Sequence, residues 1–186
     1  MAHRVYLVGG PARVGKSSLA QRLLRNDGIA WLPTDVLRTV LRAVLPQLDD
    51  LDQGDVSAAA VGELMYPYIE QAVEVCGEEA ERFLVEGPDI VPSTVTRLAA
   101  ALPAIAIRAC FLGNVGFSGG DLASYRGPKP QHQEASLTEL DTTAAWIRRE
   151  GNHYRRECAR LGLPYVDVGD LGFDAAMAEA RRHLLT

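Results

Sequence analysis

The most informative residues of the sequence lie near its N-terminus, in the segment GPARVGKS that runs from Gly10 to Ser17. The segment matches the pattern G-x-x-x-x-G-K-[ST], in which backbone N–H groups surround phosphate oxygens. In such a loop the ammonium of Lys16 reaches the β- and γ-phosphates, and the hydroxyl of Ser17 binds Mg²⁺. The alternative is an incidental glycine-rich turn. We predict that a nucleotide is bound by Gly10, Pro11, Ala12, Arg13, Val14, Gly15, Lys16, Ser17 and Ser18.

The flanking sequence has the local structure that such a loop requires. Residues 5–8 are a short apolar run that ends at Gly9, which is typical of a buried parallel strand followed by a turn. In residues 17–25 the apolar side chains recur at helical spacing. The loop alone does not separate kinases from ATPases, GTPases and motors. The small size, the lack of an N-K-x-D guanine-specificity motif and the short distance to the second strand favour a small-molecule kinase.

A second group of polar residues follows the next predicted strand, residues 29–32. The carboxyl ends of parallel strands meet at one edge of a sheet, so Asp35 and Arg38 should lie on the same edge as the phosphate loop. A carboxylate beside the γ-phosphate can accept the proton of a hydroxyl, and an arginine there can hold an anionic acceptor. The spacing equally allows a helix capped by Thr34 or Asp35, with Arg38 in solvent.

Glu86 follows the third predicted strand, residues 83–85. Its carboxylate could orient a Mg²⁺-bound water or the acceptor hydroxyl, whereas the alternative is a turn residue before Gly87. An acid at the end of a buried apolar strand favours the functional interpretation, because a buried charge needs a partner. We predict that Ser17 and Glu86 hold the metal, and that Glu86 and Gly87 contact the acceptor.

Residues 113–133 are rich in Gly, Pro and polar residues and have little periodicity, so we expect a lid over the nucleotide there. Arg126 lies in this stretch, and a lid arginine can neutralise the charge that builds on the transferred phosphoryl group. Further arginines follow on a long predicted helix. For each of them alone a solvated basic face is the better explanation, but we expect at least one to contact phosphate. These arginines are Arg148, Arg149, Arg155 and Arg156.

The whole chain of 186 residues predicts a single α/β domain. Five short apolar runs alternate with segments of helical periodicity, and this alternation predicts a parallel sheet with helices on both faces. The predicted strands are 5–8, 29–32, 83–85, 104–112 and 164–168. The predicted helices are 17–25, 35–45, one that starts near Asp55, 93–101, 137–161 and 175–185.

Composition excludes several classes of partner. The net charge of −5 argues against a nucleic-acid binder, which usually carries a basic excess. No apolar run is long enough to cross a bilayer, only Met1 to Arg4 precede the first strand, and the three cysteines lack metal-site spacing. We expect a cytoplasmic protein that is a monomer or a homodimer, with a small molecule as its partner.

Three motifs resemble those of the 2-phosphoglycerate kinase-like P-loop kinases and, more distantly, chloramphenicol phosphotransferase and shikimate kinase. The motifs are the loop from Gly9 to Ser18, the run Thr34, Asp35, Arg38 and Arg42, and the segment from Leu84 to Pro92. The resemblance covers residues 5–92. It implies a nucleoside-monophosphate-kinase-like fold with strand order 2-3-1-4-5, ATP and Mg²⁺, and a hydroxyl acceptor. It also implies that Asp35 is the base and that Arg38 contacts the acceptor.

Together these features predict an ATP-dependent phosphotransferase that moves the γ-phosphoryl group to a hydroxyl of a small molecule, with an anionic metabolite as one candidate. The predicted catalytic residues are Lys16, Asp35 and Arg126, and the predicted acceptor residues are Asp35, Arg38, Glu86 and Gly87. The acceptor helices are expected at about 35–80. The alternatives are a nucleotide hydrolase, a toxin-type or antibiotic kinase, and a non-catalytic nucleotide-responsive module.

Overall fold

A five-stranded sheet forms the centre of the computed structural model, which describes residues 3–45, 48, 57–124 and 135–186. The strands are β1 (Arg4–Gly9), β2 (Ala30–Pro33), β3 (Arg82–Glu86), β4 (Ala106–Gly113) and β5 (Tyr165–Asp167). They lie in the order β2-β3-β1-β4-β5, and every neighbouring pair is parallel. The strand order and the parallel pairing are both confirmed.

The six predicted helices are present. They are α1 (Lys16–Asp27), α2 (Thr34–Arg42), α3 (Ala58–Glu79), α4 (Pro92–Ala101), α7 (Leu137–Leu161) and α9 (Phe173–Leu185). Two short helices among the described residues, α5 (Gly119–Ser124) and α8 (Val168–Leu171), were not predicted. Ser57 caps α3 by accepting a hydrogen bond from Ala60 N, whereas the predicted start at Asp55 lies outside the described residues. Among the described residues, no helix is long and apolar enough to cross a membrane.

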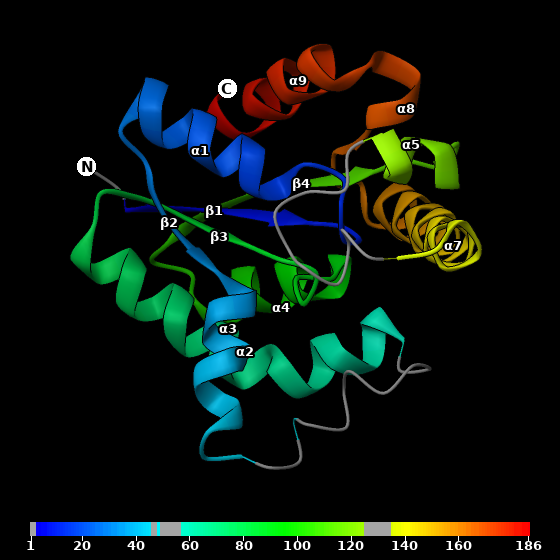
Figure 1. Cartoon of the computed structure of the whole chain (residues 1–186). Helices are drawn as coiled ribbons and strands as arrows, with labels where there is room; N and C mark the ends of the chain where they lie inside the picture. The colour runs from blue at the N-terminus through cyan, green and yellow to red at the C-terminus, as the bar shows by residue number, and fades with distance from the viewer. Residues whose placement is uncertain (1–2, 46–47, 49–56, 125–134) are drawn as a thin grey trace.

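Both faces of the sheet are covered, because side chains alternate along each buried strand. On β1, Tyr6 and Val8 belong to a core shared with α1 and α9, whereas Val5 and Leu7 belong to a core shared with α3 and α4. Figure 1 shows α1 and α9 on one side of the sheet and α3 and α4 on the other. The long helix α7 contributes to both cores and so closes the molecule at the β4–β5 side.

The carboxyl ends of the strands bring the predicted site residues to one edge. Glu86, at the end of β3, is in register with Val8 of β1 and with Pro33 of β2. The backbone N–H of Gly87 donates to Val8 O at 3.0 Å and ties the β3–α4 loop to the strand that precedes the phosphate loop. The phosphate loop, the start of α2 and the β3–α4 loop therefore meet at the carboxyl edge of the sheet, where such folds bind their ligands.

Candidate active site

The phosphate loop depends on backbone conformations that side chains oppose. Gly10 and Gly15 have φ values of 130° and 98°, and Arg13 has a φ of 71°. A Cβ on Gly10 would lie 2.0 Å from Leu112 O, so the chain can pass there only without a side chain. Gly15 is the N-cap of α1, and no side chain caps this helix end. The unbonded N–H groups and the helix dipole of α1 therefore suit a bound anion.

Lys16 carries the positive charge of the loop. It is the first residue of α1, its side chain is buried, and its Nζ donates to Pro11 O at 2.7 Å. Burial lowers the pKa of Lys16, while the carboxylates of Glu86, Asp35 and Asp89 act in the opposite direction. The ammonium therefore lies where the loop and the acid groups of two other segments converge.

Ser17 and Glu86 form the link between the loop and β3. Ser17 Oγ donates to Glu86 Oε1 at 2.8 Å. Glu86 is the last residue of β3 and is only 2% exposed, so it is part of the buried strand and not a turn residue. Burial raises the pKa of Glu86, and the Lys16 ammonium and the Ser17 hydroxyl oppose that shift.

These two oxygen groups fit Mg²⁺. The ion is usually bound through one or two carboxylates together with substrate phosphates, so an all-protein cage is not required. In the described ranges, no group of three or more His, Cys, Asp or Glu side chains could hold a metal by itself. The predicted pair Ser17 and Glu86 is the donor set that the structure places beside the phosphate loop.

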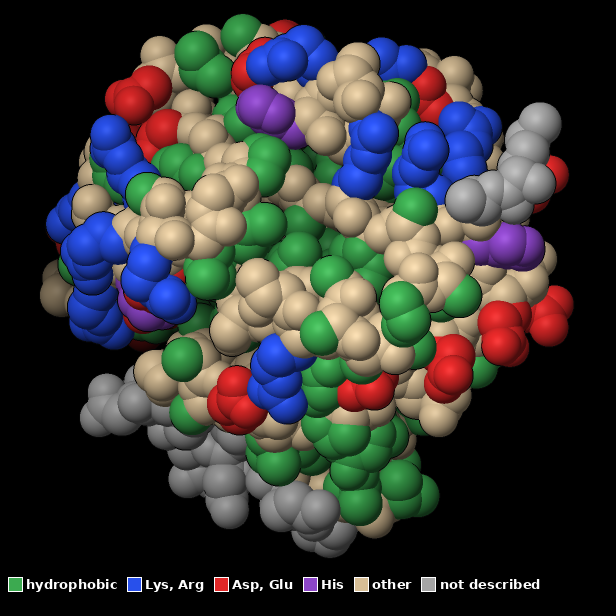
Figure 2. All heavy atoms as spheres, turned by 180° about the vertical axis from the view of Figure 1, so that it is seen from behind, with side chains coloured by type: hydrophobic (Ala, Val, Ile, Leu, Met, Phe, Trp, Pro, Cys, Tyr) green, Lys and Arg blue, Asp and Glu red, His purple; other side chains and the backbone are tan. Residues whose placement is uncertain are grey.

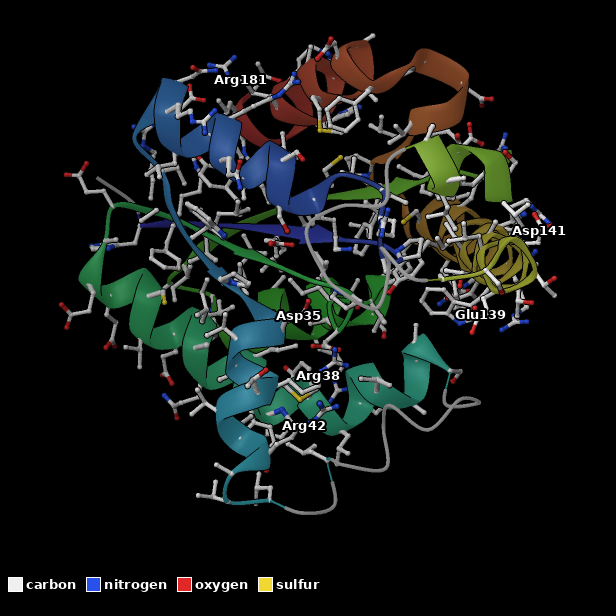
Figure 3. The ribbon with its side chains drawn as sticks, viewed as in Figure 1. Asp35, Arg38, Arg42, Glu139, Asp141 and Arg181 are labelled. Carbon is white, nitrogen blue, oxygen red and sulfur yellow. The ribbon has the colours of Figure 1, made fainter. Side chains whose placement is uncertain are left out.

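The residues predicted for the acceptor side begin at α2. Thr34 is the first residue of this helix, Pro33 is its N-cap, and no side chain caps it, so the helix-cap interpretation of Thr34 and Asp35 is wrong. Instead, Asp35 Oδ1 accepts a hydrogen bond from Arg38 Nη2 at 3.1 Å. Figure 3 shows Asp35 near the start of α2, with Arg38 and Arg42 following along the same helix. The Asp35 side chain is 54% exposed, whereas that of Arg38 is 18% exposed.

Asp89 is a member of this site that the sequence analysis missed. Its Oδ1 accepts a hydrogen bond from Arg38 Nη1 at 3.2 Å, and the residue is 1% exposed. Burial raises the pKa of Asp89, and the nearby guanidinium of Arg38 opposes that shift. The signal in the sequence was an acid directly before the apolar pair Ile90 and Val91, because a carboxylate in a buried segment needs a partner.

Gly87 has a packing role that its predicted place at the acceptor did not reveal. A Cβ at this position would lie 1.8 Å from Thr34 Oγ1, so only glycine lets α2 approach the β3–α4 loop this closely. Its N–H is already bonded to Val8 O. Gly87 therefore sets the distance between α2 and the loop that carries Asp89.

Of the arginines predicted for the lid and for α7, those of α7 have separate surroundings in the described structure. Arg126 lies outside the described residues, while residues 119–124 of the predicted lid form α5. Arg148 Nη1 donates to Phe117 O at 2.5 Å and so holds the segment after β4. Arg149 lies 3.8 Å from Glu150, and Arg155 and Arg156 are exposed. Figure 2 shows Lys and Arg side chains on several parts of one face of the molecule, the side where α7 lies among them.

The comparisons with known proteins identify the fold. No family model matches the sequence, and no curated protein matches it. Shikimate kinase from Bacteroides thetaiotaomicron is similar in structure, with a TM-score of 0.58 and 12% identity over 96% of this chain and 95% of that chain. An uncharacterized protein from Eubacterium ventriosum has a TM-score of 0.54 and 13% identity over 98% of both chains. The fold shared with these structures is a five-stranded parallel sheet in the predicted order β2-β3-β1-β4-β5, with helices on both faces.

Proposed function

We propose that this protein is an ATP-dependent phosphotransferase that moves the γ-phosphoryl group to a hydroxyl of a small molecule. The observation that carries the proposal is the convergence at one sheet edge of Lys16 and Ser17 with the carboxylates of Glu86 and Asp35. A phosphate loop alone would suit any nucleotide-binding protein. An exposed carboxylate on the neighbouring helix adds a group that can receive a proton from an acceptor.

On the nucleotide side, the amides of the loop and the N-terminus of α1 would bind the phosphates of ATP, and Lys16 would balance their charge. Ser17 and Glu86 would hold Mg²⁺, which supplies charge neutralisation at the phosphate oxygens. The Ser17–Glu86 hydrogen bond, 2.8 Å long, keeps both oxygens together before any ligand arrives. This preorganisation lowers the free energy needed to arrange the site when the nucleotide binds.

On the acceptor side, Asp35 would receive the proton of the attacking hydroxyl. The hydroxyl oxygen forms a bond to the γ-phosphorus, the bond between that phosphorus and the β–γ bridging oxygen breaks, and ADP leaves with the electron pair. Because the transition state of such transfers is loose, the proton leaves late and the carboxylate also acts by holding the hydroxyl in line. Asp35 is suited to this role because it is the most exposed of the acid groups near Lys16.

Several finer features stay predictions of the sequence. They are the 2-phosphoglycerate kinase-like assignment, the lid at 113–133 with Arg126, acceptor contacts of Arg38 and Gly87, the cytoplasmic location, the monomeric or homodimeric state, and the absence of nucleic-acid and membrane partners. The shikimate kinase likeness supports the general reaction, since the named enzyme is a kinase of about the same length.

A panel of hydroxyl compounds tests the proposal through acceptor-dependent release of ADP. We expect at least one acceptor to raise ADP release well above the rate with ATP and Mg²⁺ alone, and Lys16→Met to abolish the increase. ADP release that is fast and independent of every acceptor would indicate a nucleotide hydrolase. Tight ATP binding without turnover on any compound would indicate a non-catalytic nucleotide-responsive module, and selective turnover of antibiotics would indicate the drug-modifying alternative.

A further inference from the structure

The guanidinium of Arg38 lies between two carboxylates. Its Nη2 donates to Asp35 Oδ1 at 3.1 Å and its Nη1 donates to Asp89 Oδ1 at 3.2 Å. Two carboxylates and one guanidinium leave one negative charge in excess. The most exposed member is Asp35, at 54%, while Arg38 is mostly covered. A molecule in solvent therefore has more access to the Asp35 carboxylate than to the Arg38 guanidinium. Figure 3 shows both residues on α2.

Other cations of this region are also engaged. Lys16 belongs to the phosphate loop and bonds to Pro11 O. Arg97 donates to Glu63 at 2.6 Å and its guanidinium carbon lies 3.5 Å from the centre of the Tyr66 ring. Arg42 stands about 6 Å beyond Arg38 along α2, as four helical residues rise, and it too has an interaction of its own. Among the described residues of α2, Arg38 is therefore the cation whose ion pairs with Asp35 and Asp89 are seen directly.

We propose that Asp89 is a specificity-determining residue that makes the acceptor side select uncharged hydroxyl compounds over anionic ones. This inference rests on the proposed function, and it names a different class from the anionic acceptor that Arg38 indicated in the sequence. Asp89 forms an ion pair with Arg38. Its negative charge offsets the attraction that a guanidinium without this partner would exert on a carboxylate or phosphate. A hydroxyl compound instead finds the Asp35 carboxylate as a hydrogen-bond acceptor.

The burial of Asp89 supports its role in setting the charge preference of the acceptor side. Asp89 Oδ2 and Thr34 Oγ1 are both buried and neither makes a hydrogen bond of normal geometry within the described part of the chain, although the Thr34 hydroxyl lies close enough to oppose the rise in the pKa of Asp89. An incompletely bonded buried carboxylate is unfavourable for folding, so its stabilising value is a weak reason for its presence. Its one strong contact is with Arg38. The geometry therefore supports a role in which Asp89 neutralises the charge of the Arg38 guanidinium.

The test uses sulfate as an anionic probe, with the phosphate loop first filled by Mg²⁺ and a non-hydrolysable ATP analogue. The nitrogen NMR signal of the Arg38 Nε–H group, assigned with Arg38→Lys, reports sulfate binding at this guanidinium. We compare the wild type with Asp89→Asn. The amide keeps an oxygen for Arg38 and places its NH₂ beside the Thr34 hydroxyl, whose oxygen can accept a hydrogen bond, so the variant should fold. We expect sulfate to bind Arg38 at least about tenfold more tightly in Asp89→Asn than in the wild type.

Glu63→Gln is the matched control, because it removes one charge from another arginine–carboxylate pair on the same side of the sheet. It should leave sulfate binding at Arg38 unchanged. If Asp89→Asn does not fold, Asp35→Asn removes the other carboxylate and should give a similar gain. Equal binding of sulfate by the wild type and by the folded variant would overturn the proposal.

Turnover gives a second readout that a merely structural role would not produce. In matched pairs such as glycerol and glycerate, or glucose and gluconate, the wild type should prefer the uncharged member. Asp89→Asn should shift that preference toward the anion by at least about tenfold, whereas a general loss of structure would lower both rates together. A wild type that prefers the anionic members would contradict the inference. Failure of the ATP analogue to bind in calorimetry would instead count against the proposed function, and it would be seen before sulfate is added.

Discussion

The proposed nucleotide side and the proposed acceptor side of this site are built in different ways. The phosphate loop is one continuous segment, and its shape comes from backbone conformations at Gly10 and Gly15 and from the start of α1. The acceptor side consists of side chains from α2 and from the β3–α4 loop, held by the pair Arg38 and Asp89. A site made by backbone is visible in a short motif, whereas one made by side chains depends on packing between distant segments.

The largest expected effect is the loss of MgATP affinity on substitution of Lys16, which belongs to the nucleotide side. Lys16→Met should weaken MgATP binding by roughly 100-fold or more, because a charge-assisted bond contributes up to about 3 kcal/mol. The fold should survive, since burial lowers the pKa of Lys16 and methionine removes a charge that burial disfavours. Calorimetry measures the affinity, and Arg22→Met on the same helix, where Arg22 pairs with Asp174, is the control. Unchanged affinity in Lys16→Met would remove the basis of the nucleotide side.

Asp35→Asn should affect the acceptor side alone. We expect turnover to fall by roughly 10²-fold, the usual contribution of a positioned proton acceptor, while MgATP affinity stays within a few-fold. Steady-state kinetics and calorimetry together measure this split. Asp174→Asn provides a matched control, because Asp174 is also an aspartate in the first turn of a helix that pairs with an arginine. Wild-type turnover in Asp35→Asn would transfer the role of base to Glu86.

Gly87→Ala tests whether the spacing of α2 matters. The added Cβ would meet Thr34 Oγ1 at 1.8 Å, so we expect the free energy of unfolding to fall by about 1–3 kcal/mol. Acceptor turnover should fall more than MgATP affinity, because the clash displaces α2 from the β3–α4 loop. In Gly116→Ala, the control, the new Cβ has its nearest contact at 3.8 Å and should be tolerated. Adding Thr34→Ala should recover part of the loss; no loss at all would mean that the spacing is not fixed by this contact.

The smallest effect concerns stability and pH at Asp89. Burial raises the folded-state pKa of this carboxyl above its unfolded value, so the ionised form destabilises the fold. That penalty is absent below the unfolded pKa and is complete above the folded one. Asp89→Asn should therefore be slightly more stable than the wild type near neutral pH, by less than about 1 kcal/mol, and show no gain in acid. Thermal unfolding followed against pH measures the difference, and a gain that grows toward low pH would have the wrong sign.

The features that could be predicted from the sequence are those that short, local patterns of residues determine. The motif at Gly10 to Ser17 and the alternation of apolar runs led to the loop, the five strands and their sheet. Asp89 was missed because its partner Arg38 is 51 residues away, and only packing brings them together. The helix α5 was missed because its six residues are too few to show periodicity. The role of Gly87 required knowing that Thr34 faces it.

The most direct test of the proposed activity follows the fate of the γ-phosphoryl group by phosphorus NMR. The protein is incubated with ATP, Mg²⁺ and the acceptors that raise ADP release, beside Lys16→Met and Asp35→Asn. We expect a phosphate monoester signal to grow in step with ADP in the wild type, to be absent in Lys16→Met and to grow about 10²-fold more slowly in Asp35→Asn. Formation of inorganic phosphate in place of a monoester, at a rate that no acceptor changes, would contradict a phosphotransferase.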